Sequence, residues 1–203
     1  SKIKHYTTKI NSGITPKGGS ETYLDNGIPL IRSQNVHFDG LHLDNIAYIS
    51  SKTNEQMKNS QIKDHDILLN ITGASIGRCT YIPNNFGEGN VNQHVCIIRT
   101  SKEINYKYLT MFFTTSQIQS LINGIQEGAS RQGLTFQNIK NFDLMVPPIE
   151  EQKQIIDLLD IKIPKINIAI KKTSSQIEKL YEYRKSMISS AVTGKIDVRE
   201  VVA

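Results

Sequence analysis

Short apolar runs alternate with clusters of glycine, asparagine and serine as far as about residue 148. The runs are rich in isoleucine, valine, tyrosine and phenylalanine, and such runs between turn residues predict β-strands. The predicted strands are residues 29–32, 46–49, 66–71, 78–82, 93–99 and 142–146. The polar and glycine-rich residues 84–90 predict a hairpin loop between two of them.

One segment of this region has helical rather than strand spacing. Asn105 is a good N-cap, and the residues after it repeat at helical spacing until Gly124. The apolar positions of this predicted helix are Tyr108, Leu109, Phe112, Phe113, Leu121 and Ile122. A helix among several strands predicts an α+β domain over residues 1–148.

A heptad pattern begins after Pro147 and Pro148, which favour the end of one element and the start of a helix. Glu150 and Glu151 suit the positive end of that helix. From Leu159 onward, seam positions alternate four and three residues apart. They are Leu159, Ile163, Ile166, Ile170, Thr173, Ile177, Leu180, Arg184, Met187 and Ala191.

Pro164 lies inside this ladder and removes one backbone donor. It predicts a kink or restart, and therefore two helices, residues 150–161 and 164–191. The second would be about 40 Å long, too long to bury its apolar stripe on a small domain alone. We expect a coiled coil through Leu159, Ile163, Ile166, Ile170, Ile177, Leu180 and Met187. The alternative is a helix packed back on its own domain, and residues 192–203 are expected to pack there as a tail.

Composition narrows the function classes only slightly. The net charge of +5 and the pI of about 9.1 are compatible with a polyanionic partner, but the excess charge is spread along the chain. No apolar run is long enough to span a bilayer, and no signal peptide begins the sequence, so we expect a cytoplasmic protein. Cys79 and Cys96 form no Cys-x-x-Cys pair, which favours two reduced apolar cysteines.

Motifs for catalysis are incomplete. Residues 73–78 resemble a phosphate loop but are one residue short and lack the Lys-Ser/Thr pair, so they predict a tight turn. Near His94 there is no nucleophile elbow. Val146 and Ile149 flank the two prolines where an amino-methyltransferase would have an Asn or Asp and an aromatic residue. We predict no catalytic centre.

Metal-capable side chains gather at one place in the sequence. They come from a segment that contains Gly40 and has no helical pairing of ligands, so no metal site is predicted. These side chains are His37, Asp39, His42 and Asp44.

An ordered set of motifs along nearly the whole chain resembles the specificity subunit of type I restriction-modification enzymes. The matching residues are 13–16, 27–32, 34–36, 66–69, 73–77, 92–94, 128–133, 136, 139, 147–152 and 192–198. The resemblance implies a target recognition domain over residues 1–148 and a conserved helical region over residues 149–191 that pairs with a second such helix in antiparallel fashion. It also implies double-stranded DNA, methyltransferase subunits and a restriction/translocase subunit as partners. S-adenosylmethionine and ATP would then bind to those partners, and this chain would hold no cofactor.

Length is where the chain departs from this family, whose members usually carry two recognition domains and two helical regions. The chain is expected to be either a natural half-subunit or a fragment of a two-domain chain. In both cases homodimerisation would rebuild a full subunit with two-fold symmetry, which would read a split, palindromic site. Two alternatives remain open, a stand-alone DNA-binding regulator and a coiled-coil scaffold whose domain binds protein.

Base reading would use Arg for guanine and Asn or Gln for adenine. Arg32 and Arg131 adjoin polar loops and are our preferred guanine readers, although each could instead form a salt bridge or contact phosphate. Lys17 is a candidate phosphate contact. The other candidates are Gln34, Asn35, Asn70, Thr72, Ser75, Arg78, Asn92, Gln93, His94 and Gln132.

Overall fold

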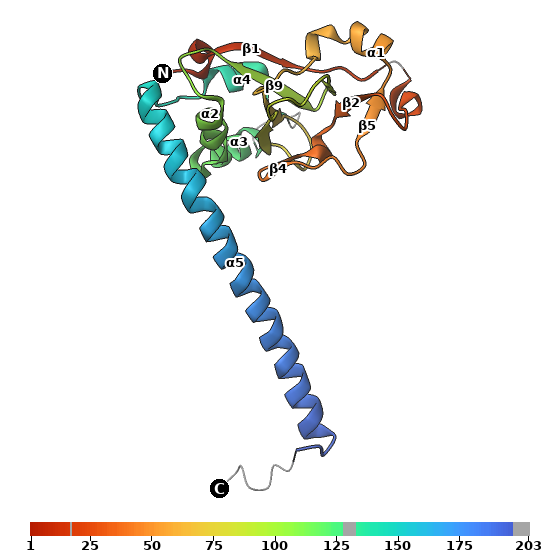
Figure 1. Cartoon of the computed structure of the whole chain (residues 1–203), viewed down its shortest axis with the longest axis vertical. Helices are drawn as coiled ribbons and strands as arrows, with labels where there is room; N and C mark the ends of the chain where they lie inside the picture. The colour runs from red at the N-terminus through yellow and green to blue at the C-terminus, as the bar shows by residue number, and fades with distance from the viewer. Residues whose placement is uncertain (17, 128–132, 197–203) are drawn as a thin grey trace. The chain divides into compact units, whose positions relative to one another are not determined.

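The computed structural model describes residues 1–16, 18–127 and 133–196, and it divides into two compact units with a boundary between Ile155 and Ile156 (Figure 1). The strands, all in the first unit, are β1 (Thr7–Ser12), β2 (Ile28–Ile31), β3 (Val36–His37), β4 (Gly40–Leu41), β5 (Ala47–Ile49), β6 (Ile67–Asn70), β7 (Cys79–Tyr81), β8 (Asn90–Val91) and β9 (Val95–Thr100). The α-helices of this unit are α1 (Ser51–Gln56), α2 (Tyr106–Thr114), α3 (Ser116–Glu127), α4 (Phe136–Asn141) and the first turns of α5 (Ile149–Val192). Short 3-10 helices are η1 (Ile3–Tyr6), η2 (Gly19–Thr22), η3 (Ser33–Asn35) and η4 (Lys58–Ser60).

Strands and helices together confirm the α+β fold class. The largest sheet is antiparallel, in the order β1-β9-β6-β7. A second sheet has the order β5-β2-β8, in which β2 pairs antiparallel with β5 and parallel with β8. The strands β3 and β4 form a separate two-stranded hairpin.

The central strands of the large sheet are buried on both faces. Alternate side chains of a strand point to opposite sides of the sheet, so each strand contributes to the packing on both sides. In β6, Ile67 and Leu69 join the apolar cluster formed with α2, α3 and α4, whereas Leu68 joins the cluster of the second sheet. In β9, Ile98 and Ile97 divide between the same two clusters. One sheet therefore separates two cores.

Three predicted elements of this unit differ from those observed. Residues 142–146 form no strand, since only Asp143 makes a bridge, to Lys2 at the chain start. Residues 84–90 are not a hairpin loop, because they lead from β7 to β8 in the other sheet. The predicted helix after Asn105 is two helices, interrupted where the hydroxyl of Thr115 donates to the carbonyl of Phe112.

The predicted break at Pro164 is also wrong. Helix α5 runs without interruption from Ile149 to Val192. A proline removes only one N–H donor, so the hydrogen bonds of the turns on either side are kept, at a local cost of about 3 kcal/mol. Within the described residues, no helix combines the length and apolar content that a membrane span requires. Residues 197–203 of the predicted C-terminal tail lie outside the described residues.

Candidate nucleic-acid interface

The ends of three strands meet at one edge of the two sheets. Asn70, the last residue of β6, pairs with Val95, the first residue of β9. Strand β8 runs parallel to β2, so both strands end at the same side, and the backbone N–H of Asn92 donates to the carbonyl of Ile31 at 3.1 Å. The polar segments that follow β2, β6 and β8 are therefore neighbours, although they are far apart in sequence.

These segments line a surface pocket of about 430 Å³. Five of the residues predicted from the sequence contribute to it, and none of its lining residues is acidic. The lining consists of Ser33, Gln34, Thr72, Gly73, Ala74, Ser75, Arg78 and His94. Gly73 and Ala74, which the sequence identified only as a turn, add exposed backbone to the pocket.

Asn70 holds the pocket together from beneath. Its side chain is fully buried, and its amide nitrogen donates to the carbonyl of Ser33 at 2.8 Å and to the hydroxyl of Ser75 at 3.0 Å. The backbone of Asn70 also bonds to Arg78 and Gly77, which closes the turn between β6 and β7. Asn70 is thus a supporting residue that fixes two pocket segments, and its buried side chain is out of reach of a base.

His94 has both ring nitrogens engaged. The amide nitrogen of Gln93 lies 2.8 Å from Nε2 and can only donate, so Nε2 accepts and Nδ1–H is directed to the hydroxyl of Thr72. The backbone N–H of His94 donates to the side-chain oxygen of buried Asn92. These bonds fix the imidazole tautomer and leave His94 and Thr72 as one rigid wall of the pocket.

The two described arginines among the candidates differ in their surroundings. The guanidinium of Arg32 donates to the carbonyl of Asn45 at 2.9 Å and lies 5.4 Å from the ring centre of Tyr23. Its backbone N–H donates to Asn35, which is itself buried and caps η3. Arg78 lies in the pocket, and its guanidinium makes no hydrogen bond or ion pair with another described residue. The geometry therefore favours Arg78 over Arg32 as a cation available to a ligand.

Three candidates, Lys17, Arg131 and Gln132, lie outside the described residues. The described chain resumes at Gly133, where an added Cβ would lie 3.3 Å from the side chain of Thr72. The next residue, Leu134, donates its backbone N–H to the carbonyl of Ile71 at 2.8 Å. Gly133 and Leu134 therefore lie beside the wall of the pocket.

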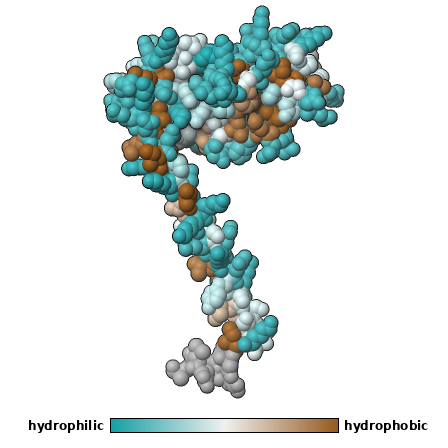
Figure 2. All heavy atoms as spheres, in the orientation of Figure 1, coloured by the Kyte–Doolittle hydropathy of each residue, from teal (hydrophilic) through white to brown (hydrophobic). Residues whose placement is uncertain are grey.

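Helix α5, taken by itself, exposes most of the predicted seam. Six of the seven predicted contact residues have between 42% and 66% of their surface exposed, and Leu159 is half-buried. The six are Ile163, Ile166, Ile170, Ile177, Leu180 and Met187. Figure 2 shows brown, apolar spheres that recur between polar ones along the helix.

The model of the type I restriction modification DNA specificity domain family matches residues 8–179. The chain belongs to this family. A relative of this specificity-domain protein, the type I restriction enzyme EcoBI specificity subunit of Escherichia coli, is 25% identical over 178 residues, which cover 85% of this chain and 36% of the relative.

Two solved structures have the same fold as this specificity-domain protein. The HsdS subunit from Thermoanaerobacter tengcongensis superimposes with a TM-score of 0.63 at 17% identity, covering 97% of this chain and 45% of that chain. A chain in a structure of the type I R-M system gives a TM-score of 0.70 at 18% identity, covering 94% of this chain and 44% of that chain. The present chain thus spans less than half the length of these proteins.

Proposed function

We propose that this chain is a sequence-reading half of a type I specificity subunit. Residues 1–148 would read double-stranded DNA for partner methyltransferase and restriction/translocase subunits, and residues 149–191 would pair with a second copy. The observation that carries the proposal is the pocket where the strand ends meet, whose lining has no acidic residue. In this pocket the guanidinium of Arg78 makes no hydrogen bond or ion pair with any other described residue. A guanidinium that is free to make two parallel bonds is the commonest reader of guanine.

The target sequence is the first thing to measure. We would co-express the full chain with its cognate methyltransferase subunits and sequence the methylated DNA. The proposal expects a split, palindromic motif, because a two-fold pair of identical domains reads the same bases twice. An undivided motif, or the absence of directed methylation with active methyltransferase, would contradict it.

Arg78→Ala then tests the pocket on that target. Loss of one bidentate base contact should cost about 1–3 kcal/mol of binding free energy, which fluorescence anisotropy would record as roughly 5- to 150-fold weaker binding. Lys102→Ala is the matched control, since Lys102 is an exposed cation of the same unit that does not line the pocket. Equal losses on target and random DNA would assign Arg78 to phosphate contact instead of base reading.

The surface of α5 supports pairing with a second helix. Ile177, Leu180, Tyr181 and Arg184 surround a hollow of about 230 Å³. Residues at i, i+3, i+4 and i+7 form the hole that receives one side chain of a facing helix in a coiled coil. A seam residue of a partner helix would therefore fit into this hollow.

An antiparallel pair centred at position 175 brings every seam residue opposite another seam residue. In this register the facing positions are 163 with 187, 166 with 184, 170 with 180, and 173 with 177. The domains would lie at opposite ends of the pair, so the helix would act as a ruler that separates them by about one turn of DNA, roughly 34 Å, or more.

Cysteine cross-linking distinguishes the two orientations. The double variant Ile170→Cys/Leu180→Cys should form an inter-chain disulfide in the antiparallel pair, whereas Ile170→Cys alone should not. Burial raises the pKa of Cys79 and Cys96 to about 12, which keeps the native thiols from competing. Efficient cross-linking of the single variant would indicate a parallel pair.

The triple variant Ile166→Lys/Ile170→Lys/Ile177→Lys tests whether pairing is needed at all. Three charges along the seam should give monomers in light scattering, with little site-specific DNA affinity. Intact dimers would refute pairing through this seam.

A further inference from the structure

The β3–β4 hairpin brings two histidines to one face. Its register pairs His37 with Gly40 and Val36 with Leu41, and the backbone N–H of His42 donates to the carbonyl of Asn35. Residues two apart on a strand share a face, so His37 and His42 are diagonal neighbours there. Gly40, with φ of 138°, permits the tight turn that carries Asp39 between them.

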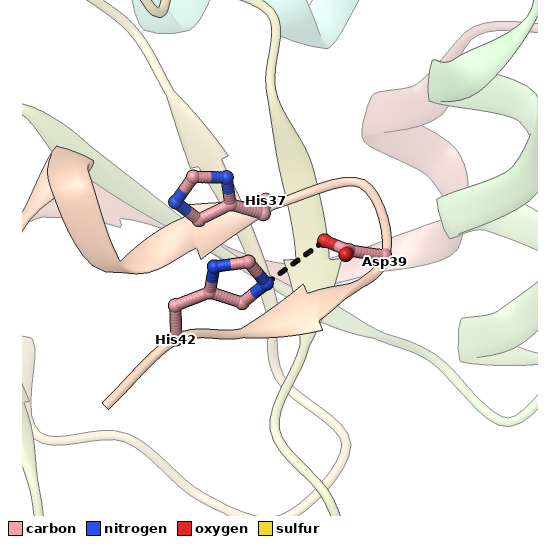
Figure 3. Close-up of side chains that lie close together, drawn as sticks. All are labelled: His37, Asp39 and His42. Atoms are coloured by element: carbon pink, nitrogen blue, oxygen red, sulfur yellow. Dashed lines mark ion pairs between the residues drawn. The ribbon is translucent and has the colours of Figure 1, made fainter. Parts of the chain in front are cut away.

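Contacts within this group are close (Figure 3). The imidazole rings of His37 and His42 stack with centroids 3.9 Å apart and planes within 13°. His42 Nε2 lies 3.1 Å from a carboxylate oxygen of Asp39. One potential ligand atom from each of the three side chains lies within 4.8 Å of the other two. Because the nitrogen lone pairs of the two stacked rings lie in nearly parallel planes, the rings would have to rotate about their side-chain bonds for all three groups to meet one ion.

Hydrogen bonding prepares His37 for this role. Its Nε2 lies 2.9 Å from the carbonyl oxygen of Gln34, which can only accept, so Nε2 carries the proton. The lone pair is then on Nδ1, and a second-shell carbonyl of this kind is what orients the metal-binding histidines of known sites. The ring is therefore held in the tautomer whose Nδ1 is available to bind a metal ion.

The ligand set selects the class of metal. Two imidazole nitrogens and one carboxylate oxygen suit Zn²⁺ and neighbouring transition metals, whereas Mg²⁺ and Ca²⁺ prefer all-oxygen sites. We propose that His37, Asp39 and His42 bind one Zn²⁺-class ion, with water completing the coordination. The ion would clamp the exposed hairpin turn, and through His37 it would restrain the η3 segment that contributes Gln34 to the pocket. No metal site was predicted from the sequence because this segment lacks helical pairing of ligands, whereas a hairpin supplies such pairing across its strands.

Isothermal titration of the full chain with ZnCl₂ tests the proposal, and Co²⁺ absorption reports ligand geometry. The wild type should bind one equivalent, and His42→Ala and Asp39→Asn should each weaken binding by at least about tenfold. His5→Ala is the matched control, because His5 is an exposed histidine in η1, outside the cluster. It should bind like the wild type.

Thermal unfolding gives a second measurement that separates metal binding from folding. Zn²⁺ should raise the Tm of the wild type and of His5→Ala, but not that of His42→Ala, and Mg²⁺ should raise none of them. Each variant is also melted without metal to establish that it folds. Zinc binding of unchanged affinity in His42→Ala and Asp39→Asn, or no zinc binding by the folded wild type, would overturn the assignment. Because neither measurement involves DNA, these results stand apart from the test of base reading.

Discussion

Gln152 offers the sharpest test of how the first turns of α5 are held within the first unit. Its side chain is 0% exposed. The side-chain oxygen accepts the backbone N–H of Asn105 at 2.8 Å, and the amide nitrogen donates to the carbonyls of Glu103 at 3.1 Å and Pro147 at 2.8 Å. One amide thus joins the segment before α2 to the linker before α5.

Gln152→Ala removes all three bonds and leaves their partners without a replacement donor or acceptor. Each bond contributes about 1 kcal/mol of net stability, so the free energy of unfolding should fall by about 3 kcal/mol. The better helix propensity of alanine offsets only about a few tenths of a kcal/mol of this loss. For a domain of this size, about 2–4 °C of Tm per kcal/mol gives a fall of roughly 6–12 °C.

Differential scanning calorimetry of the full chain would measure this fall. Gln154→Ala is the matched control, since Gln154 is an exposed glutamine of the same helix. It should melt like the wild type. Gln152→Glu should be less stable than Gln152→Ala, because it turns carboxylate oxygen toward the two carbonyls. If Gln152→Ala melted within a degree of Gln154→Ala, the three bonds would not support the fold.

Three further changes test other parts of the first unit. Asp66 is fully buried and accepts two bonds of 2.7 Å from the guanidinium of Arg99, so Asp66→Ala should lower the unfolding free energy in urea by about 3–5 kcal/mol; a loss below 1 kcal/mol would contradict a structural role. The hydrogen bond from Lys2 lowers the pKa of Asp143, so the stability from this exposed pair is present above the ordinary carboxyl pKa and is lost as pH falls through the lowered one. The small difference in Tm between Asp143→Asn and the wild type should accordingly vanish at the acid end of a pH series, and a difference that grew there would refute the assignment. Asn70→Ala should cost about 1–3 kcal/mol and weaken DNA binding as well, because the pocket segments lose their common support; unchanged stability in urea would show that the amide is dispensable.

Element types were predictable where the pattern is strong. The buried strands β2, β6, β7 and β9 coincide with apolar runs, and the side chain of Asn105 accepts the N–H of Lys107 as the predicted N-cap. Strand β1 was missed because it is a half-buried edge strand of mostly polar sequence, so it lacks the apolar alternation that identifies strands. The strand predicted at residues 142–146 is the opposite error, an apolar run that forms no strand. Phe142 and Leu144 pack in the core without joining a sheet.

The candidate site was predictable as a group but not in its roles. Polar residues at strand ends were the signal, and the pocket gathers Gln34, Thr72, Ser75, Arg78 and His94 from that set. Which of them is free depends on long-range contacts that sequence spacing does not encode. Two examples are the carbonyl of Asn45 that holds Arg32 and the pairing of β8 with β2 that brings the segments together.

A surface that reads different sequences must separate the groups that hold its shape from the groups that touch bases. In this pocket, the residues that hold the shape differ from those that would be available to touch bases. Asn35 and Asn70 are buried, and their amide nitrogens donate to backbone carbonyls, so substitution there disturbs the turn itself. Gln34 is exposed and Arg78 is half-buried without a described partner, so substitution at these positions should cost the fold within about 0.5 kcal/mol. On the base-reading role proposed for this pocket, target preference would change at Gln34 and Arg78 while the framework beneath them stays constant.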